Sequence, residues 1–168
     1  MTYTISDATD DDLPVIKRVL YEAVAWDPTS PLPPMKMVVD HPELARYHRD
    51  WGRRGDLAVI AERDGEVVGG AMCRLFTEED HGYGYYDHRT PELGVAVWEG
   101  RGSGLGISLI AALEQRAVAD ELEAMSLSVE SANPAHRLYR RLGYETVEVR
   151  DGDFLMLKRL GETNEEKP

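Results

Sequence analysis

Four glycines that alternate with other residues, between an apolar stretch and a second, helix-like one, are the part of the sequence best suited to chemistry. They are Gly100, Gly102, Gly104 and Gly106. Glycine lets backbone N–H groups approach a ligand closely, and a helix N-terminus adds partial positive charge. Arg101 lies within the run and adds a full positive charge. This arrangement predicts a site for a phosphate or pyrophosphate group.

The order of residues in this glycine-rich segment excludes two common nucleotide-binding motifs. A dinucleotide fingerprint, G-x-G-x-x-G, fails in every register because Leu105, Ile107 and Leu109 stand where the third glycine is required. A P-loop fails because no Lys-Ser/Thr pair follows the glycines. What remains is the pattern R-x-x-G-x-G over residues 101–106. A glycine-rich turn that binds no ligand is the alternative at this point.

Two regular elements must hold this turn. A strand is predicted over about 92–98, and a helix runs from the glycines to about Asp120. The helix has an apolar stripe at helical spacing, formed by Leu105, Leu109, Ile110, Leu113 and Ala117. The turn therefore joins a buried strand to an amphipathic helix.

The rest of the chain predicts a mixed sheet with helices. Before the turn we expect a strand over 3–6, a helix over 13–25 capped by the acidic run at 9–12, a second helix over about 43–53, and a hairpin of strands 57–63 and 66–76 around Asp64-Gly65. After it we expect a strand over 125–130, a helix over about 134–142 capped by Asn133, and a hairpin of strands 145–150 and 154–159 around Asp151-Gly152. The order β-α-α-β-β-β-α-β-α-β-β predicts an α/β (α+β) fold with a mixed sheet of about seven strands. Residues 1–160 then form one domain, and 161–168 a polar tail that we expect to be disordered.

Composition narrows the class of partner. The 168 residues carry 19 Lys and Arg against 31 Asp and Glu, a formal net charge of −12. Since Lys and Arg contacts to phosphates supply most non-specific affinity for nucleic acid, we expect no nucleic-acid partner. No apolar run is long enough to span a bilayer and the start does not resemble a signal peptide, so we expect no membrane association and a cytoplasmic location. The single cysteine, Cys73, excludes an intrachain disulfide and a cysteine-rich metal site, and we expect no metal.

Two segments together resemble the GNAT superfamily of N-acetyltransferases. Residues 93–110 resemble its acetyl-CoA-binding segment, whose signature is Q/R-x-x-G-x-G/A after a strand, and residues 133–144 resemble its N…L-Y-x-x-L-G-F/Y element. The resemblance extends over roughly 3–160 and agrees with the element order. It implies acetyl-CoA as cosubstrate, bound in a cleft between two splayed central strands. Homodimers are common in this family, so the resemblance also implies a possible homodimer.

The resemblance also implies the residues that contact acetyl-CoA. The pyrophosphate would lie on the turn and the following helix start, at Arg101, Gly102, Ser103, Gly104, Leu105 and Gly106. The backbone of Val95, Ala96 and Val97 would bind the pantetheine arm. Asn133 is a further contact, although it and Tyr139 lie one residue closer together than in the commonest spelling of the family. Asn133 could therefore act only as a helix cap, with Ser131 or other atoms of the cap meeting CoA.

An acid and a base follow from the same resemblance. Glu92 begins the strand beside the donor site, where related enzymes often place a glutamate that acts directly or through water; a solvated carboxylate at a strand start is the alternative. Tyr139 lies where the family commonly has the tyrosine that protonates the leaving thiolate; an aromatic packing residue is the alternative. Asp87 and His88 are weaker candidates for the base, and Cys73, within a predicted strand, is expected to be an inert thiol rather than a nucleophile.

The acceptor should bind against the variable parts of the fold. Those parts are the first two helices, the segment 27–41 and the loop 77–91. We expect an aromatic wall there and carboxylates that attract a cation: Trp26, Tyr83, Tyr85, Tyr86 and Trp98, with Asp27, Glu78, Glu79, Asp80 and Asp87. The expected acceptor is a primary amine of a small, amino-acid-like molecule, attacked directly in a ternary complex. A protein N-terminus or lysine is the alternative acceptor, and a non-catalytic acyl-CoA sensor is the alternative class.

Overall fold

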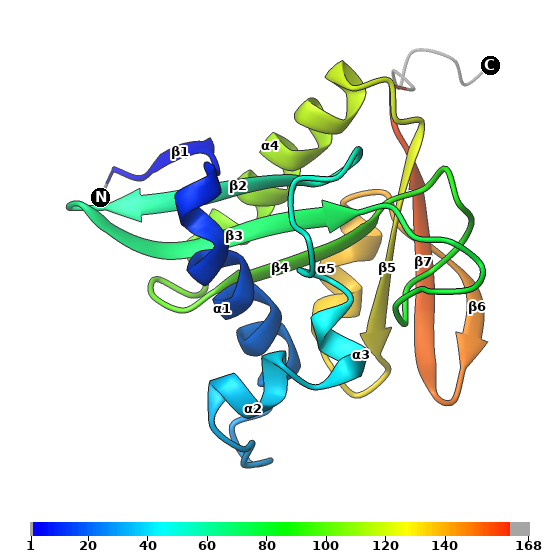
Figure 1. Cartoon of the computed structure of the whole chain (residues 1–168), viewed down its shortest axis with the longest axis horizontal. Coiled ribbons are helices and arrows are strands. Elements are labelled where there is room, and N and C mark those ends of the chain that lie inside the picture. The colour runs from blue at the N-terminus through cyan, green and yellow to red at the C-terminus, as the bar shows by residue number, and fades with distance from the viewer. Residues whose placement is uncertain (1, 162–168) are drawn as a thin grey trace.

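The computed structural model describes residues 2–161 and shows one sheet covered on both faces by helices (Figure 1). The strands are β1 (Thr4–Asp7), β2 (Leu57–Arg63), β3 (Glu66–Arg74), β4 (Glu92–Val97), β5 (Ala124–Glu130), β6 (Glu145–Arg150) and β7 (Asp153–Arg159). The helices are α1 (Leu13–Val24), preceded by the 3₁₀ turn η1 (Asp10–Asp12), then α2 (Met35–Val39), α3 (Pro42–Ala45), α4 (Leu105–Ala119) and α5 (Ala135–Arg141). This is the mixed α/β fold with a seven-stranded sheet that the sequence predicts.

The sheet contains one parallel pair of strands near its centre. Its strand order is β1-β2-β3-β4-β5-β7-β6, and every neighbouring pair is antiparallel except β4 and β5. Those two parallel strands are aligned at a single pair of residues, Glu92 and Ser126. Beyond that pair the strands separate, as Figure 1 shows. The separation opens a cleft between the two halves of the sheet.

The two faces of the sheet carry separate cores. On one face α4 packs against β2, β3 and β4, and its predicted stripe, Leu105, Leu109, Ile110, Leu113 and Ala117, is buried. On the other face α1 packs against β3 and β4 through Ile16, Val19 and Leu20. Helices from both cores pack against β3 and β4. The strand that begins with Glu92 is thus fixed from both sides.

Both predicted hairpin turns are confirmed, and the cap predicted for the first helix forms at the 3₁₀ turn that precedes it. Thr9 and Asp12 form a capping box at η1, in which the Thr9 N–H donates to Asp12 Oδ2 over 2.7 Å. Asp64 and Asp151, which open the two Asp-Gly hairpin turns, have φ of 53° and 50°. Asp tolerates this left-handed conformation better than most residues, and the glycine that follows adopts it freely.

The helix predicted over 43–53 is wrong beyond Ala45. The buried guanidinium of Arg74 donates to the carbonyl oxygens of Arg46 at 2.9 Å and Arg49 at 2.7 Å, and both its Nε and Nη2 reach Asp56. A continuing helix would use those carbonyls for its own N–H groups. A buried Arg without such partners would be far costlier than a lost helical turn. Arg74 therefore determines the irregular path of residues 46–56.

Candidate active site

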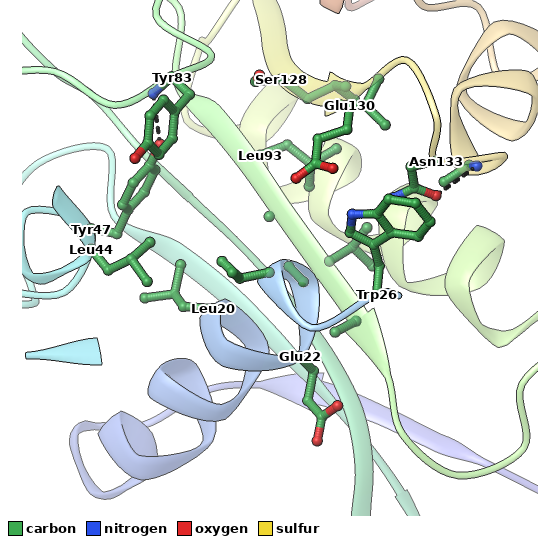
Figure 2. A pocket seen from close by; sticks show the side chains of 18 of the residues that line it. Leu20, Glu22, Trp26, Leu44, Tyr47, Tyr83, Leu93, Ser128, Glu130 and Asn133 are labelled. Atoms are coloured by element: carbon green, nitrogen blue, oxygen red, sulfur yellow. Dashed lines mark hydrogen bonds between the residues drawn. The ribbon is translucent and has the colours of Figure 1, made fainter. Parts of the chain in front are cut away.

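A cavity of about 1050 Å³ extends from the glycine-rich turn into the space between the separated strands and the first helices (Figure 2). Strand β4 lines it along its whole length, 92–97, and β5 along 127–130. Of the predicted cosubstrate residues, those lining it are Val95, Ala96, Val97, Arg101 and Asn133; both predicted catalytic residues, Glu92 and Tyr139, line it as well. The structure thus brings these residues into one cavity, whereas the rest of the glycine-rich motif, 102–106, does not line it.

The glycine turn is shaped by backbone conformations that only glycine adopts readily. Gly100, Gly102 and Gly104 have φ of 77°, 83° and 83°. A Cβ placed on Gly102, Gly104 or Gly106 would meet no atom within 4 Å, so the space above the turn is open. The first N–H groups of α4 have no partner within their helix and are donors for an anion. The turn therefore fits a pyrophosphate, while the Leu105 side chain is buried in the core and leaves only backbone for contact.

Arg101 connects this turn to the cavity wall. Its Nε donates to the Val97 carbonyl over 2.9 Å, and its guanidinium lies 3.8 Å from the Glu22 carboxylate of α1. The side chain remains 60% exposed. It therefore presents positive charge at the mouth of the cavity in an otherwise acidic protein, where an anionic ligand benefits most.

The backbone of β4 is available on its β5 side. All of β4 pairs with β3, but alignment with β5 is limited to Glu92. Residues 95–97 therefore have, toward β5, peptide groups without a strand partner in the described part of the chain. Apart from the Val97 carbonyl, which accepts from Arg101 Nε, these peptide groups suit the amide groups of an extended arm such as pantetheine.

Glu92 is a buried carboxyl group, 5% exposed, that is held by its neighbours. Its Oε1 accepts the Gly84 N–H over 2.7 Å, and the Tyr47 hydroxyl lies beside the carboxylate, where it is placed to donate a second hydrogen bond. Burial raises the pKa of Glu92 to about 7, although both hydrogen bonds and the charge of Arg46 oppose that rise. A carboxyl group with this pKa exchanges protons readily near neutral pH.

The loop over Glu92 approaches it through glycine backbone. A Cβ on Gly82 would lie 1.9 Å from the Tyr47 hydroxyl and 2.8 Å from Glu92 Oε1, and one on Gly84 would lie 2.7 Å from the Ser128 nitrogen. The Gly84 carbonyl accepts from the buried Ser126 hydroxyl over 2.6 Å. The sequence predicts this loop as part of the acceptor site, but the role of its two glycines was missed. The alternation Gly82-Tyr83-Gly84 within a polar segment is the signal that could have indicated a close backbone approach.

Tyr139 faces the same cavity from α5. Burial raises its pKa to about 12, so the phenol keeps its proton at neutral pH. Its ring contacts the Tyr144 ring at 6.1 Å, and among residues 2–161 its hydroxyl has no hydrogen-bond partner. Asn133 Oδ1 accepts from the Ala135 N–H over 3.0 Å, so its side chain satisfies the first N–H of α5, although the N-cap position belongs to Pro134 and not, as predicted, to Asn133. Asn133 also borders the cavity.

The predicted acceptor wall is only partly correct. Trp26 and Tyr83 line the cavity, and Figure 2 shows Trp26 and Glu130 reaching into it from opposite sides. The other three aromatics do not line it: Tyr85 stacks on His81 at 4.4 Å, Tyr86 lies on the surface, and Trp98 packs under Arg18.

The predicted acidic residues are wrong as a group, because none of Asp27, Glu78, Glu79, Asp80 and Asp87 lines the cavity. Asp27 instead bonds its own turn at Thr29, and Asp80 faces Arg46. The carboxylates that do line it, besides Glu92, come from the first helices and the strand ends: Glu22, Glu43, Glu130 and Asp153. His88, the weaker candidate for the base, also lies outside the lining.

Three further observations concern a thiol nucleophile, a metal site and a membrane span. Cys73 is fully buried and its pKa is raised by burial to about 12, so its thiol is inert. Within residues 2–161 there is no cluster of His, Cys, Asp and Glu side chains able to hold a metal ion. None of the helices described is long and apolar enough to cross a membrane.

Comparison with known proteins agrees with this geometry. The model of the Acetyltransferase (GNAT) family matches residues 20–144. An L-methionine sulfoximine/L-methionine sulfone acetyltransferase of Pseudomonas aeruginosa is 32% identical over 152 residues, covering 86% of this chain and 81% of that protein. The chain belongs to the GNAT family. It is an acetyl-CoA-dependent N-acetyltransferase.

Solved structures show the same fold. The PaiA N-acetyltransferase of Thermoplasma acidophilum, in complex with coenzyme A, superposes with a TM-score of 0.70 at 16% identity, covering 95% of this chain and 99% of that one. A GNAT phosphinothricin acetyltransferase of Sinorhizobium meliloti, in complex with acetyl-CoA, gives a TM-score of 0.63 at 24% identity, covering 100% and 94%. Both were crystallised with the cosubstrate or its product.

Proposed function

We propose that this enzyme transfers the acetyl group of acetyl-CoA to the primary amine of a small, amino-acid-like molecule, by direct attack in a ternary complex. The observation that carries the proposal is the single cavity that joins the glycine turn to the buried Glu92. The P. aeruginosa relative, named for two amino-acid acceptors and matched over 81% of its length, supports the acceptor class. The apolar surface of Leu20, Met37 and Leu44 in the cavity suits a side chain of methionine size.

In this proposal Glu92 is the general base. An amine with a pKa near 10.4 is mostly protonated at pH 7, and supplying its free form costs about 4 to 5 kcal/mol. With a pKa of about 7, Glu92 is partly ionised at neutral pH and can take that proton directly or through one water molecule. The amine nitrogen then bonds to the acetyl carbon as the bond from that carbon to sulfur breaks.

Tyr139 is the proposed acid. Acetyl-CoA supplies an activated thioester, whose sulfur leaves as a thiolate. The Tyr139 phenol, protonated at neutral pH and facing the cavity, can donate a proton to that sulfur. Glu92 returns its proton to solvent after the product leaves. Starting from the ammonium form, the nitrogen loses two protons. The first goes to Glu92, and the second leaves as the amide forms and replaces, through solvent, the proton that Tyr139 gives to sulfur.

The remaining predicted residues are proposed to bind acetyl-CoA. Arg101 and the N–H groups of 102–106, except that of Ser103, hold the pyrophosphate, and the peptide groups of 95–97 hold the pantetheine arm. Asn133 contributes beside its hydrogen bond to the first N–H of α5. These contacts orient the thioester toward Glu92 without requiring particular side chains on β4.

The test is thiol release from acetyl-CoA over a panel of amines, with CoA affinity measured separately. The panel contains L-methionine sulfone, simple amino acids, a diamine, a peptide with an N-terminal alanine and a lysine peptide blocked at its N-terminus. We expect the highest kcat/KM with an amino-acid-like acceptor. A preference for either peptide would replace the acceptor class, and CoA binding without turnover of any amine would favour a sensor.

A further inference from the structure

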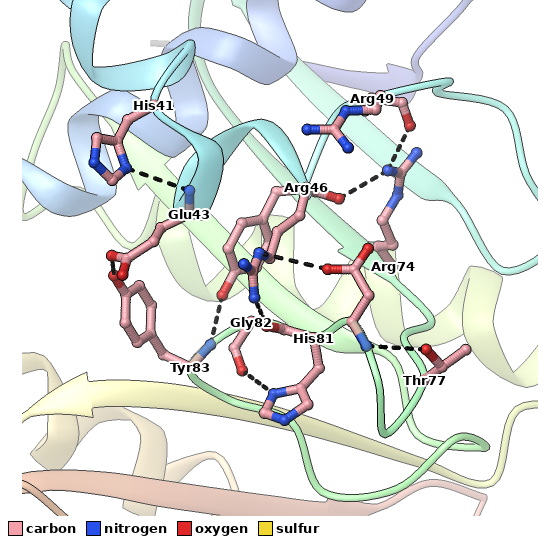
Figure 3. Close-up of polar contacts among 11 residues, drawn as sticks. His41, Glu43, Arg46, Arg49, Arg74, Thr77, His81, Gly82 and Tyr83 are labelled. Atoms are coloured by element: carbon pink, nitrogen blue, oxygen red, sulfur yellow. Dashed lines mark hydrogen bonds and ion pairs between the residues drawn. The ribbon is translucent and has the colours of Figure 1, made fainter.

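We infer that Tyr47 is a positioning residue that acts through Glu92, holding the carboxylate oriented for proton acceptance and tying it to the loop 77–91. The inference rests on the proposed function, in which Glu92 is the base. Tyr47 is 5% exposed and lies just after α3, far in sequence from Glu92. Figure 3 shows its neighbourhood, where α3 meets the loop.

The Tyr47 hydroxyl occupies a fixed place between two groups. It accepts the Tyr83 N–H over 2.9 Å, and it lies beside the Glu92 carboxylate, because a Cβ on Gly82 would meet both the Tyr47 hydroxyl and Glu92 Oε1. Since a phenol has one proton to donate, the bond from Tyr83 leaves that proton directed to Glu92. Glu92 therefore receives two donors from different segments, Tyr47 and the Gly84 N–H.

The position of Tyr47 is itself fixed by a buried ion pair. Arg74 donates to the carbonyls of Arg46 and Arg49, one residue before and two after Tyr47, and binds Asp56 at 2.8 Å. Arg74 is also the register partner of Glu92 on the neighbouring strand, so the two side chains project from the same face of the sheet. The Tyr47 ring packs edge-on against Phe76 at 5.2 Å. The hydroxyl is therefore held by contacts that do not depend on a bound ligand.

The charged and titratable groups around Glu92 indicate what loss of this hydroxyl would do. The hydrogen bond from Tyr47 and the charge of Arg46 both lower the pKa of Glu92, against the effect of burial. From β3, the Arg74 charge is balanced by Asp56, and from the loop, Tyr83 is bonded to Glu43. On β5 the facing residue is Ser126, which is not ionisable at neutral pH. Removing the Tyr47 hydroxyl should raise the pKa of Glu92 further and leave less of the base ionised at pH 7.

The first experiment compares Tyr47→Phe with wild type and with Tyr86→Phe, a matched change at a surface tyrosine of the loop 77–91. We expect kcat at pH 7 to fall about 10-fold in Tyr47→Phe, the effect of one hydrogen bond to a charged group. The KM for acetyl-CoA should not change, and Tyr86→Phe should match wild type. Unchanged kcat in Tyr47→Phe would overturn the inference.

A double-mutant cycle separates positioning from mere structural support. If Tyr47 acts through Glu92, adding Tyr47→Phe to Glu92→Gln should lower the residual kcat less than 2-fold, because the carboxylate it positions is already gone. An equal, additive loss in both backgrounds would show that Tyr47 only supports the fold. Thermal unfolding of all four proteins accompanies the cycle.

A carboxyl ¹³C NMR titration of the enzyme without substrates gives a readout independent of turnover, with the Glu92 signal assigned by its loss in Glu92→Gln. The Glu92 pKa should rise in Tyr47→Phe and remain in place in Tyr86→Phe; an unshifted or lower value overturns the inference. If wild type acetylates no amine, the proposed function fails, and this titration still decides whether Tyr47 controls Glu92.

Discussion

The two ends of the cavity are built in different ways. At the turn, the consecutive residues 101–106 present one exposed arginine and backbone N–H groups, except that of Ser103, which donates to the Gly100 carbonyl. Around Glu92, the neighbours are Tyr47, Gly84 in the loop, and Ser126, its register partner on β5, which are dispersed over some half of the chain. A site made of main chain can be encoded by a short motif. A buried base needs a shell that only the complete fold assembles.

This difference predicts that the base end is sensitive to single side chains. Glu92→Gln keeps the shape of the side chain and removes the proton acceptor, so kcat should fall about 100-fold or more. The KM for acetyl-CoA and the affinity for CoA should stay within 2-fold. Steady-state thiol release and calorimetric CoA titration measure both. A large loss of CoA affinity would show that the two ends are not independent.

The free energy of unfolding should depend on the ionisation of the same carboxyl group, Glu92. The pKa of Glu92 is raised from 4.5 in the unfolded chain to about 7 in the folded one, so its contribution is fully present below 4.5 and is lost as the pH rises through 7. The free energy of unfolding of wild type should therefore fall, relative to Glu92→Gln, by up to about 3 kcal/mol between pH 4.5 and 8. Urea unfolding at several pH values tests this. Parallel curves for the two proteins would contradict it.

A pair of glycine substitutions compares the two ends directly. Gly84→Ala places a Cβ 2.7 Å from the Ser128 nitrogen and 2.9 Å from Glu92 Cδ, which should cost about 2 kcal/mol of stability and lower kcat. Gly106→Ala meets nothing within 4 Å and lies in a helix, so it should stabilise the fold by about 0.5 to 1 kcal/mol. Denaturant unfolding and kcat give the comparison. Equal effects at the two glycines would remove the distinction drawn from the packing.

A smaller loss of activity than at Glu92 is expected at the proposed acid. Tyr139→Phe removes the proposed donor but leaves a thiolate of pKa near 8.5, which departs fairly well unaided, so kcat should fall only about 10-fold. The stability should change little, because the hydroxyl has no partner among the described residues. Rate measurements with a panel acceptor decide it, and an unchanged kcat would leave Tyr139 as a packing residue.

Much of the fold could be predicted because its signals are local. Asp64-Gly65 and Asp151-Gly152 encode their turns in two residues, and the stripe of α4 repeats at helical spacing. The segment 46–56 could not, because its path depends on Arg74, a residue of another strand whose guanidinium takes the carbonyls that a helix would use. The charged residue within an apolar strand was the available signal.

The candidate site shows the same distinction between local signals and long-range contacts. Residues 95–97 and 101–106 are predicted from a contiguous motif, and Glu92 and Tyr139 from their places beside two motifs. Tyr47 and the two glycines of the loop were missed because each matters through a contact with a residue far away in sequence. The acidic residues predicted for the acceptor end were misplaced because the path of a long loop is not encoded by its composition.

The pH dependence of kcat, with both substrates saturating, tests the central assignment most directly. Because Glu92 must be ionised to accept a proton, kcat in wild type should rise with pH through an ionisation near 7 and level off above it. Glu92→Gln should lack that ionisation and remain low across the range. A profile in Glu92→Gln that keeps both the ionisation near 7 and the wild-type plateau would show that another group is the base.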